Sequence, residues 1–257
     1  MHRLAFCPFK TIRPPPRWPP LNLLKNFTMD GHCVGKAWYI DNSAPSARLR
    51  FDASRFNSLL SQDQRGVIIN PYRDKRTFKP TLNTYLNAIK NKHVAVVGTR
   101  TPWIEAILVN LGADKVTVME YRQLHIGHPR VSVVTPFQYV SSFLNRTADK
   151  FDAVVSYSSI EHSGLGRYGD PLMPYGDMEA VAQIWCSIKS NGYLFLALPM
   201  TRDRRRCTLY WNAGRFYSYF RVQHLTANFK VIKEIETHDG AAHLLFVLQK
   251  LEQSPYS

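Results

Sequence analysis

From Lys92 onward, short apolar runs alternate with segments that carry apolar residues at helical spacing. The runs are HVAVVG, KVTVME, VSVVTP, FDAVVSYS and YLFLALP, and each ends near a glycine, a proline or a polar residue. Nearly continuous apolar strands are typical of a parallel sheet that is buried on both faces. Strands that alternate with helices therefore predict an α/β fold, with an open, mostly parallel sheet between two layers of helices.

Three segments between or beside these runs have helical patterns. They are PWIEAILVNLG, PFQYVSSFLNRT and DMEAVAQIWCSIKSNG. In the first, Pro102 suits the first helical turn and Gly112 suits the position just past the end. In the third, Asp177 is the predicted N-cap and Asn191-Gly192 the predicted stop.

The end of the chain does not follow this alternation of strands and helices. FKVIKEIE and AAHLLFVLQKL are two strand-like runs joined by THDG. An Asp-Gly pair between apolar runs is a strong signal for a β-hairpin. Fewer folds combine a parallel sheet with a terminal antiparallel hairpin than have a purely parallel sheet. This feature therefore restricts the possible folds more than any other in the sequence.

The first third of the chain is less regular. Residues 1–30 hold Pro14-Pro15-Pro16 and Pro19-Pro20, which favour an extended arm. Residues 31–92 contain GKAWYI, a candidate short strand, and TLNTYLNAIKN, a candidate helix. We expect 31–92 to be an N-terminal extension or cap, and 93–251 to be the α/β domain.

Cysteine usage and hydropathy suggest a compartment. The four cysteines form no C-x-x-C pair, so neither a zinc knuckle nor a dense disulfide framework is expected: Cys7, Cys33, Cys186 and Cys207. No apolar run reaches the roughly 18 residues of a membrane span, and prolines interrupt the N-terminus where a signal peptide would be apolar. The default expectation is a cytoplasmic protein with no membrane span in this chain.

Two N-x-[ST] triplets bear on that default. They begin at Asn26 and Asn145. Such triplets are acceptors for N-linked glycans only in the secretory pathway, so they would matter only if a secretory signal lay outside the sequence as given.

The formal net charge of +14 favours acidic partners. The densest basic cluster, Arg202 and Arg204 to Arg206, precedes the aromatic stretch TLYWNAGRFYSYF. Such a mixture could stack bases and grip phosphates, or it could be a solvated loop that enters a buried aromatic segment. No nucleic-acid-binding signature accompanies it, so we favour the second interpretation and expect no nucleic-acid partner.

Polar residues at the carboxyl ends of the predicted strands form a candidate pocket. Ligands of such sheets bind at these ends, where the strand order changes direction. The turn after the first strand supplies Gly98, Thr99 and Arg100, and a helix N-terminus behind it favours a carboxylate or phosphate. Glu120 closes the second strand, 22 residues after Gly98, where an acidic side chain can accept hydrogen bonds from both hydroxyls of a ribose.

The third part of the pocket carries a family resemblance. FDAVVSYSSIEHSGLGRYGD, with the later KSNGYLFLALP and the terminal hairpin, resembles the class I S-adenosylmethionine-dependent methyltransferases. Within that superfamily, VVGTRTPWIEA and SSIEHSGLGRYGD are similar to a largely nematode group named domain of unknown function 268, over roughly residues 30–250.

The resemblance implies a Rossmann-like three-layer sandwich whose seven-stranded sheet has its last strand antiparallel. It also implies S-adenosylmethionine as the cofactor. Gly98 and Thr99 would then lie against the methionine part of the cofactor, with Arg100 adding a cation. Glu120 would lie on the ribose, and Ser156, Tyr157 and Ser158 along the pocket floor. Tyr121, next to Glu120, is also a candidate cofactor-binding residue.

The turn after the first strand departs from the superfamily pattern. Its usual form has glycines at two or three alternating positions, whereas Thr99, Arg100, Thr101 and Pro102 follow Gly98 here. Two functions therefore stay open: a methyltransferase of unknown acceptor, such as a small molecule or glycan, or a catalytically inactive binding or scaffold protein with the same fold. A nicotinamide dehydrogenase is disfavoured because the turn after the first strand lacks G-x-G-x-x-G and because the sheet of such an enzyme would not normally end in this hairpin.

Glu161 and His162 are the candidate catalytic residues because they follow the fourth strand, at the lip of the pocket. Methyl transfer needs a positioned nucleophile and sometimes a base, and an imidazole can serve as that base. The alternative is that both residues only hold their loop. The following SGLGRYGD, with Arg167 and Asp170, is a candidate substrate-covering loop. His238 and His243 flank the predicted hairpin turn with no third ligand at a suitable spacing, so no metal is expected.

Overall fold

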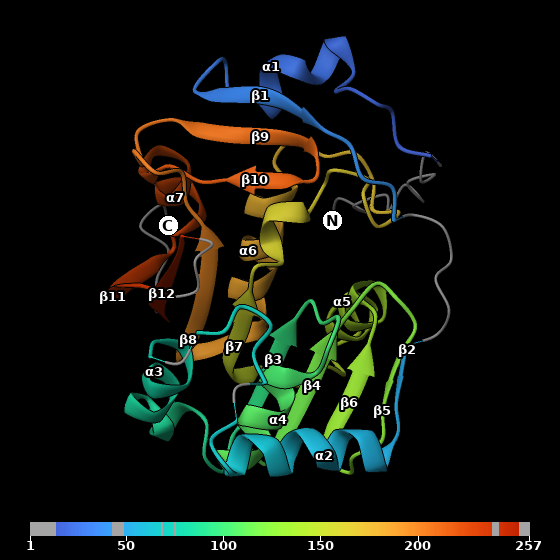
Figure 1. Cartoon of the computed structure of the whole chain (residues 1–257), viewed down its shortest axis with the longest axis vertical. Coiled ribbons are helices and arrows are strands. Elements are labelled where there is room, and N and C mark those ends of the chain that lie inside the picture. Colours follow the sequence, from blue (N-terminus) through green and yellow to red (C-terminus); the bar gives the residue numbers. More distant parts are fainter. Residues whose placement is uncertain (1–13, 43–48, 68, 75, 238–241, 252–257) are drawn as a thin grey trace.

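The computed structural model describes residues 14–42, 49–67, 69–74, 76–237 and 242–251. Its main sheet consists of seven strands, and their bounds are β3 (His93–Val97), β4 (Lys115–Met119), β6 (Val131–Val134), β7 (Phe151–Tyr157), β8 (Ile188–Pro199), β11 (Phe229–Glu236) and β12 (His243–Lys250). The strand order is β11-β12-β8-β7-β3-β4-β6 (Figure 1). The chain order reverses between β3 and β7, which is where a ligand is expected.

The expected direction of the last strand is confirmed. β12 pairs antiparallel with both β8 and β11, whereas the pairs among β8, β7, β3, β4 and β6 are parallel. The predicted turn residues His238, Asp239 and Gly240 lie outside the described residues. The fold is thus the Rossmann-like sandwich that the sequence predicts, with a mostly parallel seven-stranded sheet.

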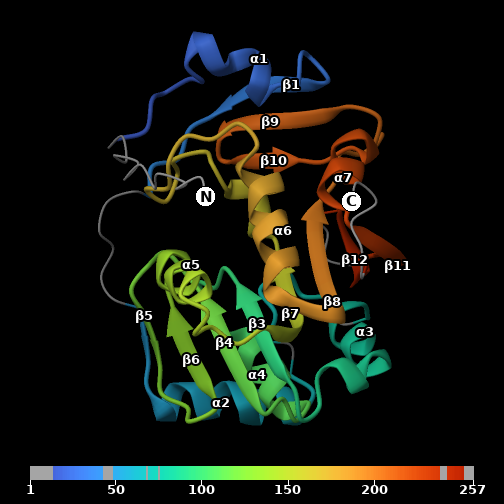
Figure 2. The same ribbon diagram turned by 180° about the vertical axis from the view of Figure 1, so that it is seen from behind.

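Helices cover both faces of this sheet, as Figures 1 and 2 show from opposite sides. On one face lie α2 (Ala53–Gln64), α3 (Phe78–Thr84) and α4 (Trp103–Asn110), and on the other lie α5 (Pro136–Leu144), α6 (Gly176–Ser187) and α7 (Tyr219–Leu225). Strand residues alternate between the two cores: Val94 and Val96 pack with the first set and Ala95 with the second. This alternation explains why the strands are apolar at nearly every position.

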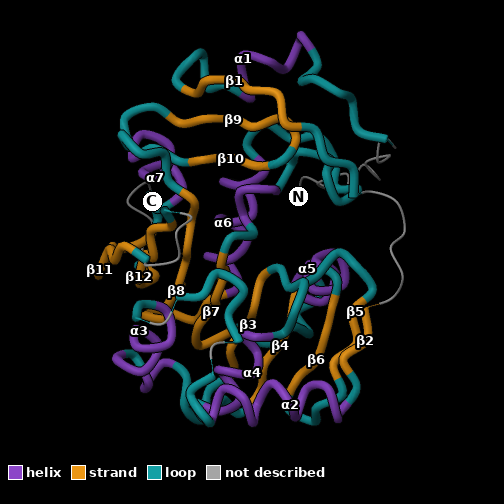
Figure 3. The backbone as a smooth tube through the Cα atoms, in the orientation of Figure 1, coloured by secondary structure: helices purple, strands orange, loops and turns teal. Residues whose placement is uncertain are grey.

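A small sheet lies beyond the carboxyl ends of the main strands (Figure 3). It consists of β1 (Cys33–Trp38), β9 (Cys207–Asn212) and β10 (Gly214–Phe216), with β1 parallel and β10 antiparallel to β9. The shorter elements are η1 (Leu21–Leu23), α1 (Leu24–Phe27), β2 (Leu49–Phe51), η2 (Leu86–Ala88), β5 (Leu124–Ile126) and η3 (Ile160–His162), with β2 parallel to β5. The first third of the chain thus shares a sheet with the last third.

A disulfide bridge joins the first register pair of that small sheet. Cys33 and Cys207 are bonded across a sequence separation of 174, with their Cα atoms 4.4 Å apart. Sequence spacing could not reveal this bridge, because only the pairing of β1 with β9 brings the two residues together. Cys186 is an exposed free thiol, and Cys7 lies outside the described residues.

Both predicted ends of α6, the N-cap and the stop, are wrong. Asp177 is not the N-cap: the cap is Tyr175, without a side-chain hydrogen bond, and Asp177 is fully buried in the first turn, two residues after the cap. The helix ends at Ser187, before Asn191-Gly192, and the chain continues directly into β8. The Nζ of Lys250 donates to the carbonyls of Trp185 and Ile188 and so satisfies this helix end.

Two other predicted helix starts are shifted, and the elements of one segment were not predicted. Pro102 is the N-cap of α4 rather than a first-turn residue. The helix expected in TLNTYLNAIKN begins earlier, at Phe78, because the carboxylate of Asp74 accepts the N–H groups of Thr77 and Phe78. The segment that follows Arg206 forms β9, β10 and α7, none of which periodicity indicated. Among the residues that the structure describes, none of the helices has both the length and the hydropathy that a membrane span requires.

Candidate functional site

A cavity of about 570 Å³ opens at the carboxyl ends of β3, β4 and β7. This volume lies within the range of about 300–1,000 Å³ that is typical of small-molecule sites. Its wall includes most of the residues predicted from sequence, namely Gly98, Thr99, Arg100, Glu120, Tyr121, Tyr157, Ser158 and His162. The structure therefore brings the turns after the three strands onto one cleft.

Gly98 is required in its turn, although for a reason other than the expected one. Its φ of +78° is in the left-handed region, and a Cβ placed there would lie 1.8 Å from the Oγ of Ser159. The close approach at Gly98 is thus to the chain segment after β7, rather than to an open ligand position. This contact joins the first turn to the segment that carries Glu161 and His162.

The side chain of Thr99 does not fill the cleft. Its Oγ1 donates to Oε1 of Glu105 at 2.5 Å, and its backbone N–H donates to Oε2 of Glu120 at 2.8 Å. Thr99 is buried, with 6% of its surface exposed. The bulky residue after the only glycine of the turn therefore points into the protein, and the cavity stays open beside it.

Glu105 lies on α4, beneath the turn. Burial raises the pKa of its carboxyl group from 4.5 to about 7, and the hydrogen bond from Thr99 only partly opposes this effect. Its Oε2 has no hydrogen-bond partner among the described residues. Glu105 thus stabilises the turn through its hydrogen bond with Thr99. The sequence did not indicate this role, because Glu105 stands in an otherwise apolar helix.

The carboxylate of Glu120 is held at the wall of the cavity. Its Oε2 accepts from Thr99, and its Oε1 accepts from the backbone N–H of Arg122 at 3.0 Å. Each carboxylate oxygen can accept a second hydrogen bond. The side chain is therefore fixed in orientation and still able to accept hydroxyl donors from a ligand.

The two candidate catalytic residues have different positions. His162 lines the cavity, whereas Glu161 is 3% exposed and does not reach the wall. Oε1 of Glu161 accepts from Oγ of Ser158 at 2.6 Å and lies 3.6 Å from Nε2 of His162. Glu161 can therefore act on a bound molecule only through His162 or Ser158.

The imidazole of His162 has one nitrogen engaged. Its Nδ1 lies 2.7 Å from the carbonyl oxygen of Ala213, an acceptor, so Nδ1 carries the proton of the neutral ring. Burial lowers the pKa of His162, and the charge of Glu161 opposes this shift while Arg167 adds to it. The neutral tautomer leaves the lone pair on Nε2, which is the atom that could accept a proton.

Ser156 does not reach the cavity. It is fully buried in the sheet, and its Oγ donates to the carbonyl oxygen of Val97 at 3.3 Å. The prediction that it lines the pocket floor is not supported by this placement, because alternate residues of a strand point to opposite faces.

Aromatic side chains that the sequence reading missed form part of the wall. The ring of Tyr157 stacks on Tyr72 with centroids 4.8 Å apart and meets Trp103 edge-on at 5.4 Å. Both Tyr72 and Trp103 line the cavity. Neither carried a sequence signal, because Tyr72 lies in the irregular extension and Trp103 opens an apolar helix.

The loop SGLGRYGD is ordered by Asp170. One carboxylate oxygen of Asp170 accepts the N–H groups of Gly164 and Gly166, and the other accepts the N–H of Tyr168. Leu165 is fully buried, packed with Trp211 and other apolar residues, so this loop is more anchored than its composition suggests.

The same loop reaches the rim that follows β4. The guanidinium of Arg122 lies 4.8 Å from the ring centroid of Tyr168, and both residues line the cavity. Arg167 donates to the carbonyl of Ala213 at 2.6 Å and to Oδ1 of Asn42 at 3.1 Å. The loop thus lines one side of the cleft and contacts the turn between β9 and β10.

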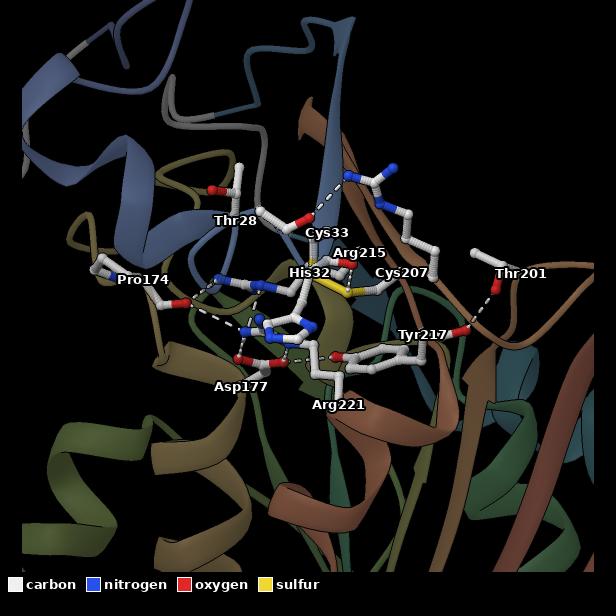
Figure 4. The surroundings of a disulfide bond; sticks show 12 residues. Thr28, His32, Cys33, Pro174, Asp177, Thr201, Cys207, Arg215, Tyr217 and Arg221 are labelled. Atoms are coloured by element: carbon white, nitrogen blue, oxygen red, sulfur yellow. Dashed lines mark hydrogen bonds and ion pairs between the residues drawn. A yellow bond between two sulfur atoms is a disulfide. The ribbon is translucent and has the colours of Figure 1, made fainter.

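A buried ionic cluster lies next to the covering loop (Figure 4). It consists of Asp177, Arg215, Tyr217 and Arg221. Arg221 donates to both carboxylate oxygens of Asp177, at 2.8 and 2.6 Å, and the hydroxyl of Tyr217 donates at 3.1 Å. Burial alone would raise the pKa of Asp177, but the charges of Arg215 and Arg221 and these hydrogen bonds outweigh it and hold the pKa below its ordinary value. Asp177 is therefore an anchor rather than a helix cap.

Arg215 connects that cluster to the loop. It lies 3.7 Å from Asp177 and donates to the carbonyls of Ser163 at 2.6 Å and Pro174 at 3.0 Å. Its side chain is 2% exposed. One buried guanidinium thus holds the start of the covering loop and the segment that follows it at Pro174. Composition alone could not distinguish this arginine from the arginines before it in the sequence. Among the described residues, no group of three or more histidine, cysteine, aspartate or glutamate side chains could hold a metal ion.

Solved structures with this fold include known methyltransferases. The 1,6-didemethyltoxoflavin-N1-methyltransferase of Burkholderia thailandensis, solved with 1,6-didemethyltoxoflavin and S-adenosylhomocysteine, matches with a TM-score of 0.50 at 14% identity, covering 84% of this chain and 100% of its own. The N-methyltransferase NodS of Bradyrhizobium japonicum WM9 matches with a TM-score of 0.46 at 11% identity, covering 72% and 99%. The first similarity shows the fold, and the second is too weak to carry an argument.

The family of the chain follows from its sequence. A search of curated proteins found no match. The model of the family described as "Caenorhabditis protein of unknown function, DUF268" matches residues 91–254, which include the whole main sheet and the cavity loops. The chain therefore belongs to this family, whose fold is that of the class I S-adenosylmethionine-dependent methyltransferases.

Proposed function

We propose that this protein is an S-adenosylmethionine-dependent methyltransferase whose acceptor is a small molecule or a glycan. The observation that carries the proposal is the meeting of the Gly98 turn, Glu120 and His162 on the wall of one open cavity of about 570 Å³. We assign the catalytic unit to residues 93–251 and regard 31–92 as an extension that completes the small sheet through β1.

The residues on the wall fit the cofactor. Glu120 would accept hydrogen bonds from the two ribose hydroxyls, because its orientation is fixed by Thr99 and Arg122 while its oxygens keep spare lone pairs. Arg100 is exposed on the cavity wall and would face the methionine carboxylate. Tyr121 would lie at the mouth, and Tyr157 and Ser158 along the floor. When bound, the cofactor supplies a sulfonium methyl group that is ready for displacement.

His162 would accept the proton of the acceptor. Its neutral form has the lone pair on Nε2, and the fold favours that form because burial lowers its pKa. The positive charge formed on the ring would lie 3.6 Å from a carboxylate oxygen of Glu161, which stabilises it. The carbonyl of Ala213 holds the other nitrogen and so fixes the ring orientation. Glu161 is thus a positioning residue in this proposal.

A catalytically inactive binding protein is the second candidate. The observation in its favour is the packing of Gly98 against Ser159, which uses the only glycine of the turn for an internal contact. In that case the cleft would hold a ligand without transfer.

The two candidates differ in turnover. Protein and methyl-labelled S-adenosylmethionine are incubated with small-molecule and glycan fractions from cells that express the protein. The proposal expects label in one fraction, and about a hundredfold slower transfer by His162→Ala, because general-base catalysis contributes about this much or more. His125→Ala is the matched control, since His125 is exposed on β5. Cofactor binding without transfer to any fraction would favour the inactive binding protein.

A further inference from the structure

The disulfide between Cys33 and Cys207 is part of the packed structure. Both residues are buried, at 5% and 1% exposure, and they lie in register at the start of β1 and β9. Figure 4 shows the bridge and the side chains that surround it. The bridge joins two segments that are distant in sequence, and the backbone pairing already holds them at the right separation.

Such a bridge constrains where the protein folds. Structural disulfides form and persist in oxidising environments such as the secretory lumen and the extracellular space, and they are rare where glutathione and thioredoxin keep thiols reduced. The cytoplasmic default rested on the absence of a signal peptide and a membrane span in the sequence as given, together with the absence of closely spaced cysteines. Cysteine spacing says nothing about a pair that the fold joins. The geometry therefore argues against that default, independently of any catalytic role.

The two N-x-[ST] triplets are consistent with the same compartment. Asn26 is exposed on α1, and Asn145 is exposed at the C-cap of α5. Neither side-chain amide makes a hydrogen bond to the part of the chain that the structure describes. A glycan at either position would extend into solvent and would replace no hydrogen bond between these amides and the described residues.

Both positions also avoid the cavity. The first residue of α5, Pro136, lies on the cavity wall, and Asn145 follows the last residue of that helix. At a rise of about 1.5 Å per residue, Asn145 lies roughly 13 Å from Pro136 along the helix axis. Asn26 lies on α1, on the outer side of the small sheet in Figure 1. Glycans at these two residues would leave the cleft open.

We propose that this chain folds in the oxidising lumen of the secretory pathway, where Cys33 and Cys207 are joined and Asn26 and Asn145 carry N-linked glycans. The proposal does not depend on methyl transfer, and a secretory signal would be supplied by sequence beyond the chain as given.

The test uses the full-length protein isolated from its source cells, with free thiols alkylated at lysis and without reductant. Peptide mass spectrometry should find Cys33 linked to Cys207 and Cys186 alkylated. Removal of N-glycans with peptide N-glycosidase F should convert Asn26 and Asn145 to aspartate and increase electrophoretic mobility. Asn26→Gln and Asn145→Gln should each remove one step of that mobility change, and the double variant should remove all of it.

Matched variants keep the glycan result specific. Thr28→Ser retains the acceptor triplet and should keep the glycan, whereas Thr28→Ala should lose it with Asn26 intact. Asn22→Gln, an exposed neighbour outside any triplet, should change nothing. Alkylated Cys33 and Cys207 in the unreduced protein would overturn the assignment to an oxidising lumen. An intact bridge with unmodified Asn26 and Asn145 would overturn the assignment of the two glycan sites.

Discussion

The backbone N–H of Thr99 donates to a carboxylate oxygen of Glu120 at 2.8 Å, and this bond joins the turn after β3 to the end of β4. A superfamily turn with several glycines brings its backbone close to the ligand. Here the same turn has one glycine, and the acidic residue itself holds the turn in place. Glu120 therefore stabilises the turn after β3 in addition to making the proposed ribose contact.

Glu105 should make the stability of the fold depend on pH. Its pKa rises from 4.5 to about 7 on folding, so the folded state keeps a proton that the unfolded chain releases. The free energy of unfolding should fall by about 3 kcal/mol as the pH rises from about 4.5 to 7, and then level off. Glu105→Gln should remove this fall while retaining an acceptor for Thr99.

Urea unfolding at a series of pH values measures this effect. Asp114→Asn, at an exposed carboxylate, should leave the pH dependence of the wild type unchanged. If wild type and Glu105→Gln lost stability in parallel over this range, the assigned pKa of Glu105 would be wrong.

Asp177 should be essential to the loop that covers the cavity. Asp177→Asn removes the charge that Arg215 and Arg221 share, and breaking a buried pair typically costs about 3–5 kcal/mol. Asp149→Asn removes the carboxylate of the exposed pair with Lys115 and should cost about 1 kcal/mol or less. Thermal or chemical unfolding of the two variants makes the comparison, and equal costs would argue against the anchoring role of Asp177.

Gly214 should be needed for the orientation of His162. A Cβ at this position would lie 3.1 Å from Nδ1 of His162, so Gly214→Ala must move the imidazole or the strand by a few tenths of an ångström. We expect a weaker hydrogen bond from His162 to Ala213 and a loss of about 1 kcal/mol in stability, as is usual for mild overpacking.

The measurement is the ¹⁵N resonance of His162 Nδ1, with unfolding as the second readout. Gly35→Ala is the control in the same small sheet, because a Cβ there meets only Trp18 at 3.8 Å, an ordinary contact. An unchanged His162 resonance in Gly214→Ala would show that the ring does not depend on this space.

Glu161 should raise the pKa of His162 above the value that burial alone would give. The carboxylate charge opposes desolvation of the imidazolium, so Glu161→Gln should lower the pKa of His162 further. A pH titration followed by imidazole NMR, assigned with His162→Gln, measures the change. Glu179→Gln, at an exposed residue of α6, should not shift this titration. A pKa that rises in Glu161→Gln would contradict the proposed pairing.

The sequence predicted the sheet because each strand is buried on both faces and therefore reads as an apolar run. It also predicted the cavity, since the ends of parallel strands meet at one edge and Gly98 and Glu120 both lie at such ends. It could not place Glu161, because one turn of η3 decides that His162 reaches the wall and its neighbour does not. It missed Arg215, because a buried arginine is recognisable only once its carbonyl partners are known.

Titration of the protein with S-adenosylhomocysteine by calorimetry tests the central claim most directly. The wild type should bind at one site per chain. Glu120→Ala should bind at least about tenfold more weakly, which is the loss of roughly 1.4 kcal/mol expected when a charged hydrogen bond is removed. Asp114→Ala, just before the start of β4, should bind as the wild type does. No heat from the folded wild type at high concentration, or equal affinity in Glu120→Ala, would contradict an adenosine site between Gly98 and Glu120.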